Sequence, residues 1–255
     1  MFGERQAESI IGKEIQDWLT ATAEKRGWSG ATQNSIRAAM STVFREGKRN
    51  NKITHNPARS TSRVKQAAGR IRFLTPTEEI RLSKEIPPVC IPQLDIALYT
   101  GMRKGKQFSV RWRQVDLDHR DVFLEDTKNG TSRHIHLNST AMTVLTRMRE
   151  EHDRLGLPDD TTIFVSQRHG TIANPRKWFE TALAKAGIEG VTWHTLRHTF
   201  ASRLVMAGVH LKTVQELMGH KSMAMTVRQD GCAGASRARF RGRLFRYKSD
   251  PKTDT

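Results

Sequence analysis

The sequence has only two cysteines and no long apolar run, and each shortage excludes a class of protein. Cys90 and Cys232 are too few and too far apart for a zinc site of the CxxC type or a disulfide framework. No run approaches the roughly 20 apolar residues of a membrane span, and the N-terminus lacks the apolar core of a signal peptide. We therefore expect a protein of a reducing cytoplasm that is neither secreted nor membrane-bound.

Acidic residues are also scarce relative to basic ones. There are 43 Lys and Arg residues against 26 Asp and Glu, which leaves a formal net charge of +17 and a pI near 10.5. Residues 1–72 hold 14 basic and 6 acidic side chains, and residues 229–255 hold 7 and 3. A basic excess spread along the chain is typical of a protein that wraps a polyanion, most commonly nucleic acid. A merely soluble basic protein is the alternative.

The N-terminal part reads as a small helical domain. Apolar residues at helical spacing predict one amphipathic helix that stops before Gly27 and a second that ends near residues 48–51. The first helix would bury Ile11, Ile15, Trp18, Leu19 and Ala23, and the second Ile36, Met40, Val43 and Phe44. The basic side chains left for the outside are Arg37, Arg45, Lys48, Arg49 and Lys52. They either contact phosphates or form a solvated charged face.

The length of the chain suits one large domain or two moderate ones. A change in composition separates the N-terminal part from the rest. Residues 56–71, NPARSTSRVKQAAGRI, show little apolar periodicity, and we read them as an interdomain linker. Thr75, Pro76 and Glu78 then supply the N-cap, the first-turn proline and the capping-box partner of a helix. The expected division is a helical domain at 1–62, a linker at 63–72, a second domain at 73–228 and a divergent basic tail at 229–255.

The second domain is expected to be mainly α with one small antiparallel β-sheet. A buried helix ends near Tyr99, and Gly101 breaks it and leaves Arg103 on a tight turn. Further helices are predicted from Asn138 through Met148 and over residues 174–187.

A β-hairpin is predicted between these helices. Strands are expected at 122–124 and 134–137, with Asn129 and Gly130 as the turn that joins them. Lys128 would lie beside the tip of this hairpin.

The stretch after residue 192 carries the densest polar pattern. Spacings of three and four place His194, Arg197 and His198 on one face of a helix, because such residues lie above one another. The opposite, core-facing side would hold Leu196, Phe200, Leu204 and Val205. We expect the polar face to point outward.

Two glycines shape the segment that follows. Gly208 would close the helix as a left-handed cap residue, and a second short helix at 211–218 would deliver His220 after Gly219. Cationic and hydrogen-bonding groups brought together in this way form an anion site. A solvated helix face without a ligand is the alternative.

Four short segments occur together in one order: TGMR at 100–103, TKNGTSRHIHL at 127–137, HTLRHTFAS at 194–202 and LMGHKSMAMT at 217–226. Together they resemble the tyrosine recombinases, the phage-integrase family of DNA strand-exchange enzymes. The resemblance covers most of residues 73–228, and the helical unit with its NPA turn is similar to the family's core-binding domain, although it looks short at its N-terminus. It implies a helical core-binding domain followed by an α+β catalytic domain.

The resemblance also implies site residues. Arg103 and Arg197 resemble the two arginines that hold the non-bridging oxygens of the scissile phosphate, a role suited to a guanidinium because it binds in two places and stays charged. Lys128 is similar to the hairpin lysine that protonates the departing 5′ oxygen, although an ordinary turn lysine is the alternative. His194 and His220 resemble the family's two histidines beside that phosphate.

The resemblance implies no cofactor and no metal, because arginines, a lysine and histidines supply the positive charge that magnesium brings elsewhere. The His194 and His198 pair lacks the glutamate of the HExxH zinc motif, and we assign His198 to support of the site or to helix packing. The implied partner is double-stranded DNA, with a homo-oligomer assembled on it. The implied source is bacterial or phage-encoded, with the protein in the cytoplasm at the nucleoid.

The sequence departs from the family pattern at the nucleophile. The family's tyrosine follows the late histidine by nine residues, a position held here by Gln229, whose amide cannot form a phosphotyrosine. Beyond it the apolar helix period is lost, and arginine alternates at 237–243, which indicates a translated frameshift, a fused foreign end or a basic tail that grips DNA. The only tyrosines are Tyr99, expected in the core, and Tyr247, 18 residues beyond the expected place.

A second departure is Lys106, because the family usually has an acidic residue three positions after the first arginine. We expect this change to leave Arg103 less firmly oriented and to add repulsion.

Three functions fit these residues. One is an integrase-family recombinase whose strand breakage and rejoining is impaired, and the second is a catalytically inactive remnant that binds DNA or regulates active relatives. The third, a type IB topoisomerase-like enzyme, is disfavoured by the core-binding unit and the LMGH segment. Gln229 favours the second as the present activity.

Overall fold

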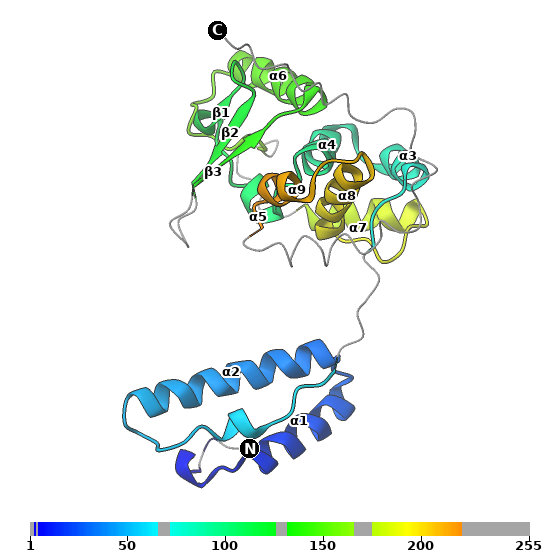
Figure 1. Ribbon diagram of the computed structural model, residues 1–255. Coiled ribbons are helices and arrows are strands. Elements are labelled where there is room, and N and C mark those ends of the chain that lie inside the picture. Colours follow the sequence, from blue (N-terminus) through cyan, green and yellow to red (C-terminus); the bar gives the residue numbers. More distant parts are fainter. Residues whose placement is uncertain (1–2, 4, 66–71, 126–131, 166–174, 221–255) are drawn as a thin grey trace. The chain divides into compact units, whose positions relative to one another are not determined.

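The computed structural model of this protein describes residues 3, 5–65, 72–125, 132–165 and 175–220. The chain divides into two compact units, residues 1–69 and 70–255 (Figure 1), and each unit has its own hydrophobic core. In the part of the chain that is described, no helix is long and apolar enough to cross a membrane.

The first unit is built on two helices whose ends follow from local sequence. Its elements are η1 (Ala7–Ser9), α1 (Gly12–Arg26), α2 (Gly30–Arg49) and η2 (Pro57–Ser60). The first helix ends where Gly27 takes a φ of +62°, and α2 begins where the Ser29 hydroxyl accepts a hydrogen bond from the Thr32 backbone N–H. The core of this unit comprises Ile10, Ile15, Leu19, Phe44, Ile53 and Ala58.

Two expectations for α2 are wrong. Val43, expected in the core, is 71% exposed. Arg37, expected outside, is partly buried, and its Nη1 donates hydrogen bonds to the Ala58 and Thr61 carbonyl oxygens. Helix α2 packs against the segment that follows it, so η2 as well as α1 decides which face of α2 is buried.

That segment also corrects the reading of residues 56–71 as a linker throughout. Pro57 and Ala58 are buried. The Asn34 side-chain amide exchanges two hydrogen bonds with the Val64 backbone, of 2.9 and 3.0 Å. Residues up to Val64 therefore belong to the first unit, because their backbone polar groups are satisfied there.

The second unit is mostly helical with one small sheet, as expected. Its elements are α3 (Pro76–Glu85), η3 (Pro88–Cys90), α4 (Ile91–Thr100), α5 (Lys104–Gln107), η4 (Trp112–Gln114), β1 (Val115–Asp116), β2 (Asp121–Leu124), β3 (Arg133–His136), α6 (Ser139–Arg154), α7 (Arg176–Lys185), α8 (Trp193–Met206) and α9 (Leu211–Met218). Thr75 and Glu78 form the predicted capping box of α3. The Asn138 side chain caps α6, which continues past the predicted Met148.

The three strands form an antiparallel sheet in the order β1, β2, β3. Val122 pairs with Ile135, and Leu124 pairs with Arg133. Val122, Leu124 and Ile135 are buried, so this face of the hairpin is turned to the core. Strand β1 was not predicted, because two residues carry no readable alternation.

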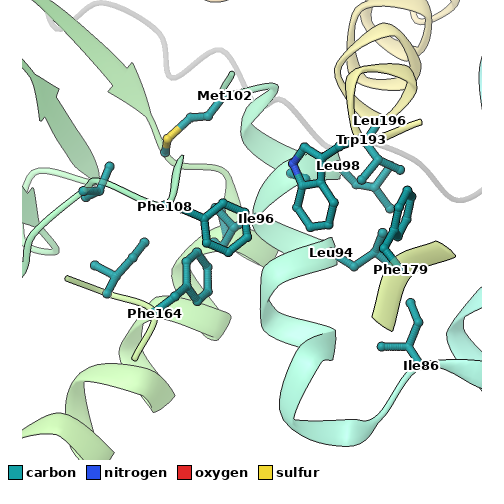
Figure 2. Packing of buried hydrophobic residues seen from close by; sticks show 14 of the residues in the cluster. Ile86, Leu94, Ile96, Leu98, Met102, Phe108, Phe164, Phe179, Trp193 and Leu196 are labelled. Carbon is teal, nitrogen blue, oxygen red and sulfur yellow. The ribbon is translucent and has the colours of Figure 1, made fainter. Parts of the chain in front are cut away.

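Helix α4 lies at the centre of the second unit, against α6 and α8. Figure 2 shows its apolar side chains surrounded by aromatic rings. The Trp193 ring lies 5.4 Å from the ring of Phe108 and 5.1 Å from that of Phe179, centroid to centroid. Because Trp193 is the first residue of α8, this packing fixes the start of the helix that carries the HTLRH segment.

A separate apolar cluster joins α8 to α9. It comprises Phe200, Ala201, Leu204, Val214 and Met218. As predicted, Gly208 takes a positive φ, of +83°, just beyond the end of α8. The two helices therefore share an apolar cluster of their own, while the start of α8 packs in the main core.

Candidate phosphodiester-binding site

Arg103 follows the abrupt end of α4. Gly101 has a φ of +61°, and a Cβ added there would lie 3.0 Å from the Phe200 Cε1 atom, so both the backbone and the contact with α8 require glycine. Arg103 comes next as the N-cap residue of α5, with its side chain exposed. Its Nη2 donates a hydrogen bond of 3.4 Å to the Gly219 carbonyl oxygen. The turn thus directs this guanidinium to the end of α9.

Arg197 is 2% exposed, which corrects the expectation that it points outward together with His194, which is exposed. Helix α8 is enclosed because Leu196 joins the main core while Phe200 joins the cluster with α9. The guanidinium of Arg197 lies between these packed surfaces. Its Nη1 donates to the Gly101 carbonyl oxygen and its Nη2 to the Met218 carbonyl oxygen.

Backbone dipoles hold this buried charge. Both carbonyl acceptors belong to helix C-terminal ends, which carry partial negative charge. Burial, followed by the charges of Arg103 and Arg133, lowers the pKa of Arg197 to about 9, so the guanidinium stays charged at neutral pH. Within the described ranges, no carboxylate is paired with Arg103 or Arg197.

His220 is placed by the cap of α9. Gly219 ends that helix with a φ of +58°. The His220 backbone N–H donates to the Gln215 carbonyl oxygen at 3.0 Å, and the Gln215 side-chain amide donates back to the His220 carbonyl oxygen at 3.0 Å. Burial, followed by the charges of Arg197 and other arginines, lowers the pKa of His220 to about 4. The imidazole is therefore neutral at pH 7.

His194 lies on the first turn of α8, with its side chain exposed. Partial burial, followed by the charges of Arg197 and Arg103, lowers its pKa. The His198 ring lies one turn further along, 4.6 Å from the His194 ring at an interplanar angle of 82°. Burial, followed by the charges of His194 and Arg197, lowers the pKa of His198 to about 4. His198 therefore packs beside His194 as a neutral ring.

A cavity of about 340 Å³ opens beside His194 and Arg197. The rings of Phe179 and Trp193 contribute to its wall. Space for a ligand group thus adjoins these two polar side chains.

Two further expected features are Lys128 and Lys106. Lys128 falls outside the described residues, so its expected role stays a prediction. Lys106, where the family usually has an acid, donates from its Nζ to the Glu125 carbonyl oxygen at 2.7 Å. This ammonium is held by the end of β2.

Arg133 was not singled out from the sequence. It begins β3, and a Cβ added to Gly219 would lie 2.9 Å from its Cζ atom, so the guanidinium packs against the cap of α9. Its charge contributes to the lowered pKa of Arg197 and of His220. The alternation of side chains along the strand could have identified it, because Arg133 lies on the same side of β3 as the buried Ile135.

The comparisons with known proteins identify the family of this chain. The family model described as "Phage integrase family" matches residues 72–229. This chain belongs to the phage integrase family. It is 33% identical over 169 residues to the integrase of Salmonella phage P22, which covers 62% of this chain and 43% of that protein. It is 29% identical over 218 residues to the tyrosine recombinase XerD of Listeria monocytogenes, which covers 81% of this chain and 73% of that protein.

A solved structure is similar over most of the chain. It is the lambda integrase (75-356) dimer bound to a COC' core site, with 25% identity, a TM-score of 0.73, and coverage of 91% of this chain and 83% of that chain. The expected fold, a tyrosine-recombinase catalytic fold with a small antiparallel sheet, is thereby confirmed. The chain spans less than half the length of the P22 integrase.

Proposed function

We propose that this chain is a DNA-binding, integrase-family site-specific recombinase that holds a backbone phosphodiester of duplex DNA in its second unit. Its strand breakage and rejoining is impaired because Gln229 occupies the position of the nucleophile. One observation carries the proposal: Arg103 and Arg197 both donate to the backbone of residues 218–219 at the end of α9, and no carboxylate in the described segments is paired with them. Guanidiniums bind phosphate through strong, often bidentate, charge-assisted hydrogen bonds.

The two arginines have different tasks in this proposal. The hydrogen bonds from Arg197 to Gly101 and Met218 use two of its five N–H groups and fix the plane of the guanidinium. Fixed donors stabilise charge that builds on phosphate oxygens without reorganising. Arg103 is exposed and held by one long hydrogen bond, so it adjusts to the DNA backbone.

The histidines act as neutral groups. His220, with its lowered pKa, offers one N–H donor to a phosphate oxygen without adding charge to the arginine cluster. His194, exposed on α8, lies at the same site and serves as a donor or a proton acceptor. Lys128 would protonate the departing 5′ oxygen.

The missing phenol favours a second function, in which the chain binds DNA without cutting it. Gln229 has no group that forms a covalent phosphodiester with the 3′ end of a broken strand. Such a chain would be an inactive remnant, or a regulator that occupies sites of active recombinases.

The partners and location belong to the same proposal. The net charge of +17 supports duplex DNA as the partner. Solved lambda integrases include a dimer on a core site and a tetramer on a Holliday junction, and we extend homo-oligomer assembly on DNA to this chain. We place the protein in the cytoplasm, at the nucleoid, where that DNA lies. We propose that the phosphate contacts need no metal or other cofactor.

A nicked suicide substrate tests the impairment. The full chain is incubated with a pool of duplexes that carry a nick in a randomised core, and covalent adducts are sought on SDS gels and mapped by mass spectrometry. We expect a salt-sensitive mobility shift without an adduct. An adduct on any tyrosine of the unmodified protein, Tyr247 included, would contradict the impairment.

Two controls keep this result interpretable. Lambda integrase with a nicked core site must give an adduct under the same conditions. Q229Y tests whether the phenol alone is missing, and we expect it to remain inactive because the sequence after residue 229 also departs from the family pattern. A chain that fails to shift any duplex would overturn the DNA-binding proposal itself.

A further inference from the structure

A third arginine meets the end of α9 from a different element. Arg133 opens β3 and pairs across the hairpin with Leu124, on the side of the strand that carries the buried Ile135. A long basic side chain on this side is directed along the buried face of the sheet rather than into solvent. This side chain is half-buried and reaches the end of α9.

The contact with Gly219 locates the guanidinium. A Cβ added there would lie 2.9 Å from the Arg133 Cζ atom, closer than such atoms approach in real proteins. A larger residue at position 219 would be strained at its φ of +58° and would displace the Arg133 guanidinium.

Three guanidiniums therefore share two consecutive peptide groups. Arg197 donates to the Met218 carbonyl oxygen, Arg103 donates to the Gly219 carbonyl oxygen, and Arg133 packs on the Gly219 backbone. The turn after α4, the helix α8 and the strand β3 each supply one of them. A helix C-terminus carries about half a negative charge, and guanidiniums from three different elements meet it there.

We propose that Arg133 is a third phosphate-contacting arginine of this site, and that Gly219 is glycine in order to admit it. This inference rests on the proposed function and deepens it: the phosphodiester is held by guanidiniums from three elements. The shared ligand chemistry is a tetrahedral oxyanion, and inorganic sulfate is a sufficient probe.

Sulfate binding measured by thermal unfolding tests the role of Arg133. The melting temperature of the full chain is followed against sulfate concentration at constant ionic strength with chloride as the balancing anion, and each variant is compared with its own sulfate-free value. R133Q is expected to weaken sulfate binding by about tenfold or more, as R103Q does, because a charge-assisted hydrogen bond is lost. R133K should fall between R133Q and the parent, since it keeps the charge without the planar fork.

A glycine pair provides a matched control. G219A forces the Arg133 guanidinium out of its place, whereas G208A introduces the same kind of positive-φ strain at a position with nothing within 4 Å. We expect G219A to lose sulfate binding to the extent of R133Q, and G208A to keep it. R81Q, at an exposed arginine on α3, controls for the loss of one positive charge.

The outcomes separate this inference from the proposed function. If the parent binds sulfate, R103Q and R197Q lose it, and R133Q and G219A retain it, Arg133 is structural and the inference is wrong. If R133Q lowers only the sulfate-free melting temperature, the inference is equally wrong. If the parent shows no sulfate-dependent stabilisation, the phosphate site fails as a whole and this inference fails with it.

Discussion

The basic face of α2 in the first unit and Arg197 in the second unit lie in opposite environments. On α2 of the first unit, Arg45, Lys48 and Arg49 are exposed, and the contacts of the two arginines with Glu46 are long, at 3.7 Å each. In the second unit Arg197 is 2% exposed and is gripped by two backbone carbonyl groups. Exposed charges act through a screened, adaptable field, whereas a buried charge acts from a fixed position.

This difference in burial suggests separate tasks for the exposed basic side chains of α2 and for the buried Arg197. Flexible surface arginines and lysines suit contact with phosphates of any sequence. A buried guanidinium suits one phosphate in one orientation. Removing a buried charge should therefore affect folding, and removing an exposed one should affect only DNA binding.

R197A is expected to have the largest effect on stability. The substitution leaves the Gly101 and Met218 carbonyl oxygens without their partner in a buried site. We expect the free energy of unfolding to fall by roughly 2–4 kcal/mol, measured by equilibrium denaturation. R45A should change it by less than about 0.5 kcal/mol. Equal effects of the two substitutions would remove the distinction between the units.

D95N tests a partly buried carboxylate and is expected to have a smaller effect. Burial, followed by the charge of Glu79, raises the pKa of Asp95 to about 6. The folded state therefore favours the protonated form, so stability from this group is full below the unfolded value of 3.8 and is lost as pH rises through about 6. We expect D95N to be more stable than the parent at pH 7 by about 1–2 kcal/mol, after allowance for partial exposure.

Unfolding measured at pH 4.5 and pH 7 checks this sign. The difference between D95N and the parent should widen at the higher pH. D17N, on the exposed side of α1, controls for the loss of a carboxylate. A difference that stays constant with pH would exclude the raised pKa as its cause.

The double variant R45A/K48A should change the free energy of DNA binding by a small amount and leave the free energy of unfolding unchanged. We expect its affinity for duplex DNA of any sequence to fall roughly fivefold at physiological salt, with a salt slope smaller by about 0.9 for each lost phosphate contact. Titrations of a fluorescent duplex over a range of salt concentrations measure both. K84A, an exposed lysine on α3, is the matched control. An unchanged affinity and slope would remove this face of α2 from the DNA interface.

Local features of the fold were predictable from short stretches of sequence. The capping box of Thr75 and Glu78, the break at Gly101 and the cap at Gly219 all occur where the residue types predict them. These signals are strong because each depends on a few neighbouring residues and on a backbone conformation that only certain residues adopt.

Packing partners were not predictable in the same way. Helical spacing placed Arg37 outside and Arg197 in solvent, yet both are enclosed by segments that a helical wheel does not include. Arg133 escaped notice because its partner, Gly219, lies 86 positions further along the chain. Periodicity reports which side of an element is apolar, but it does not report what covers the other side.

The sequence by itself determined the family, the chemistry of the side chains and the absence of tyrosine at position 229. The tertiary structure alone decided which guanidiniums are buried and that three of them meet at the end of α9. The physical reason is that burial depends on elements that are distant in the sequence. The carbonyl groups at two helix ends and the space over Gly219 can receive the guanidiniums only when α4, β3 and α8 are packed together.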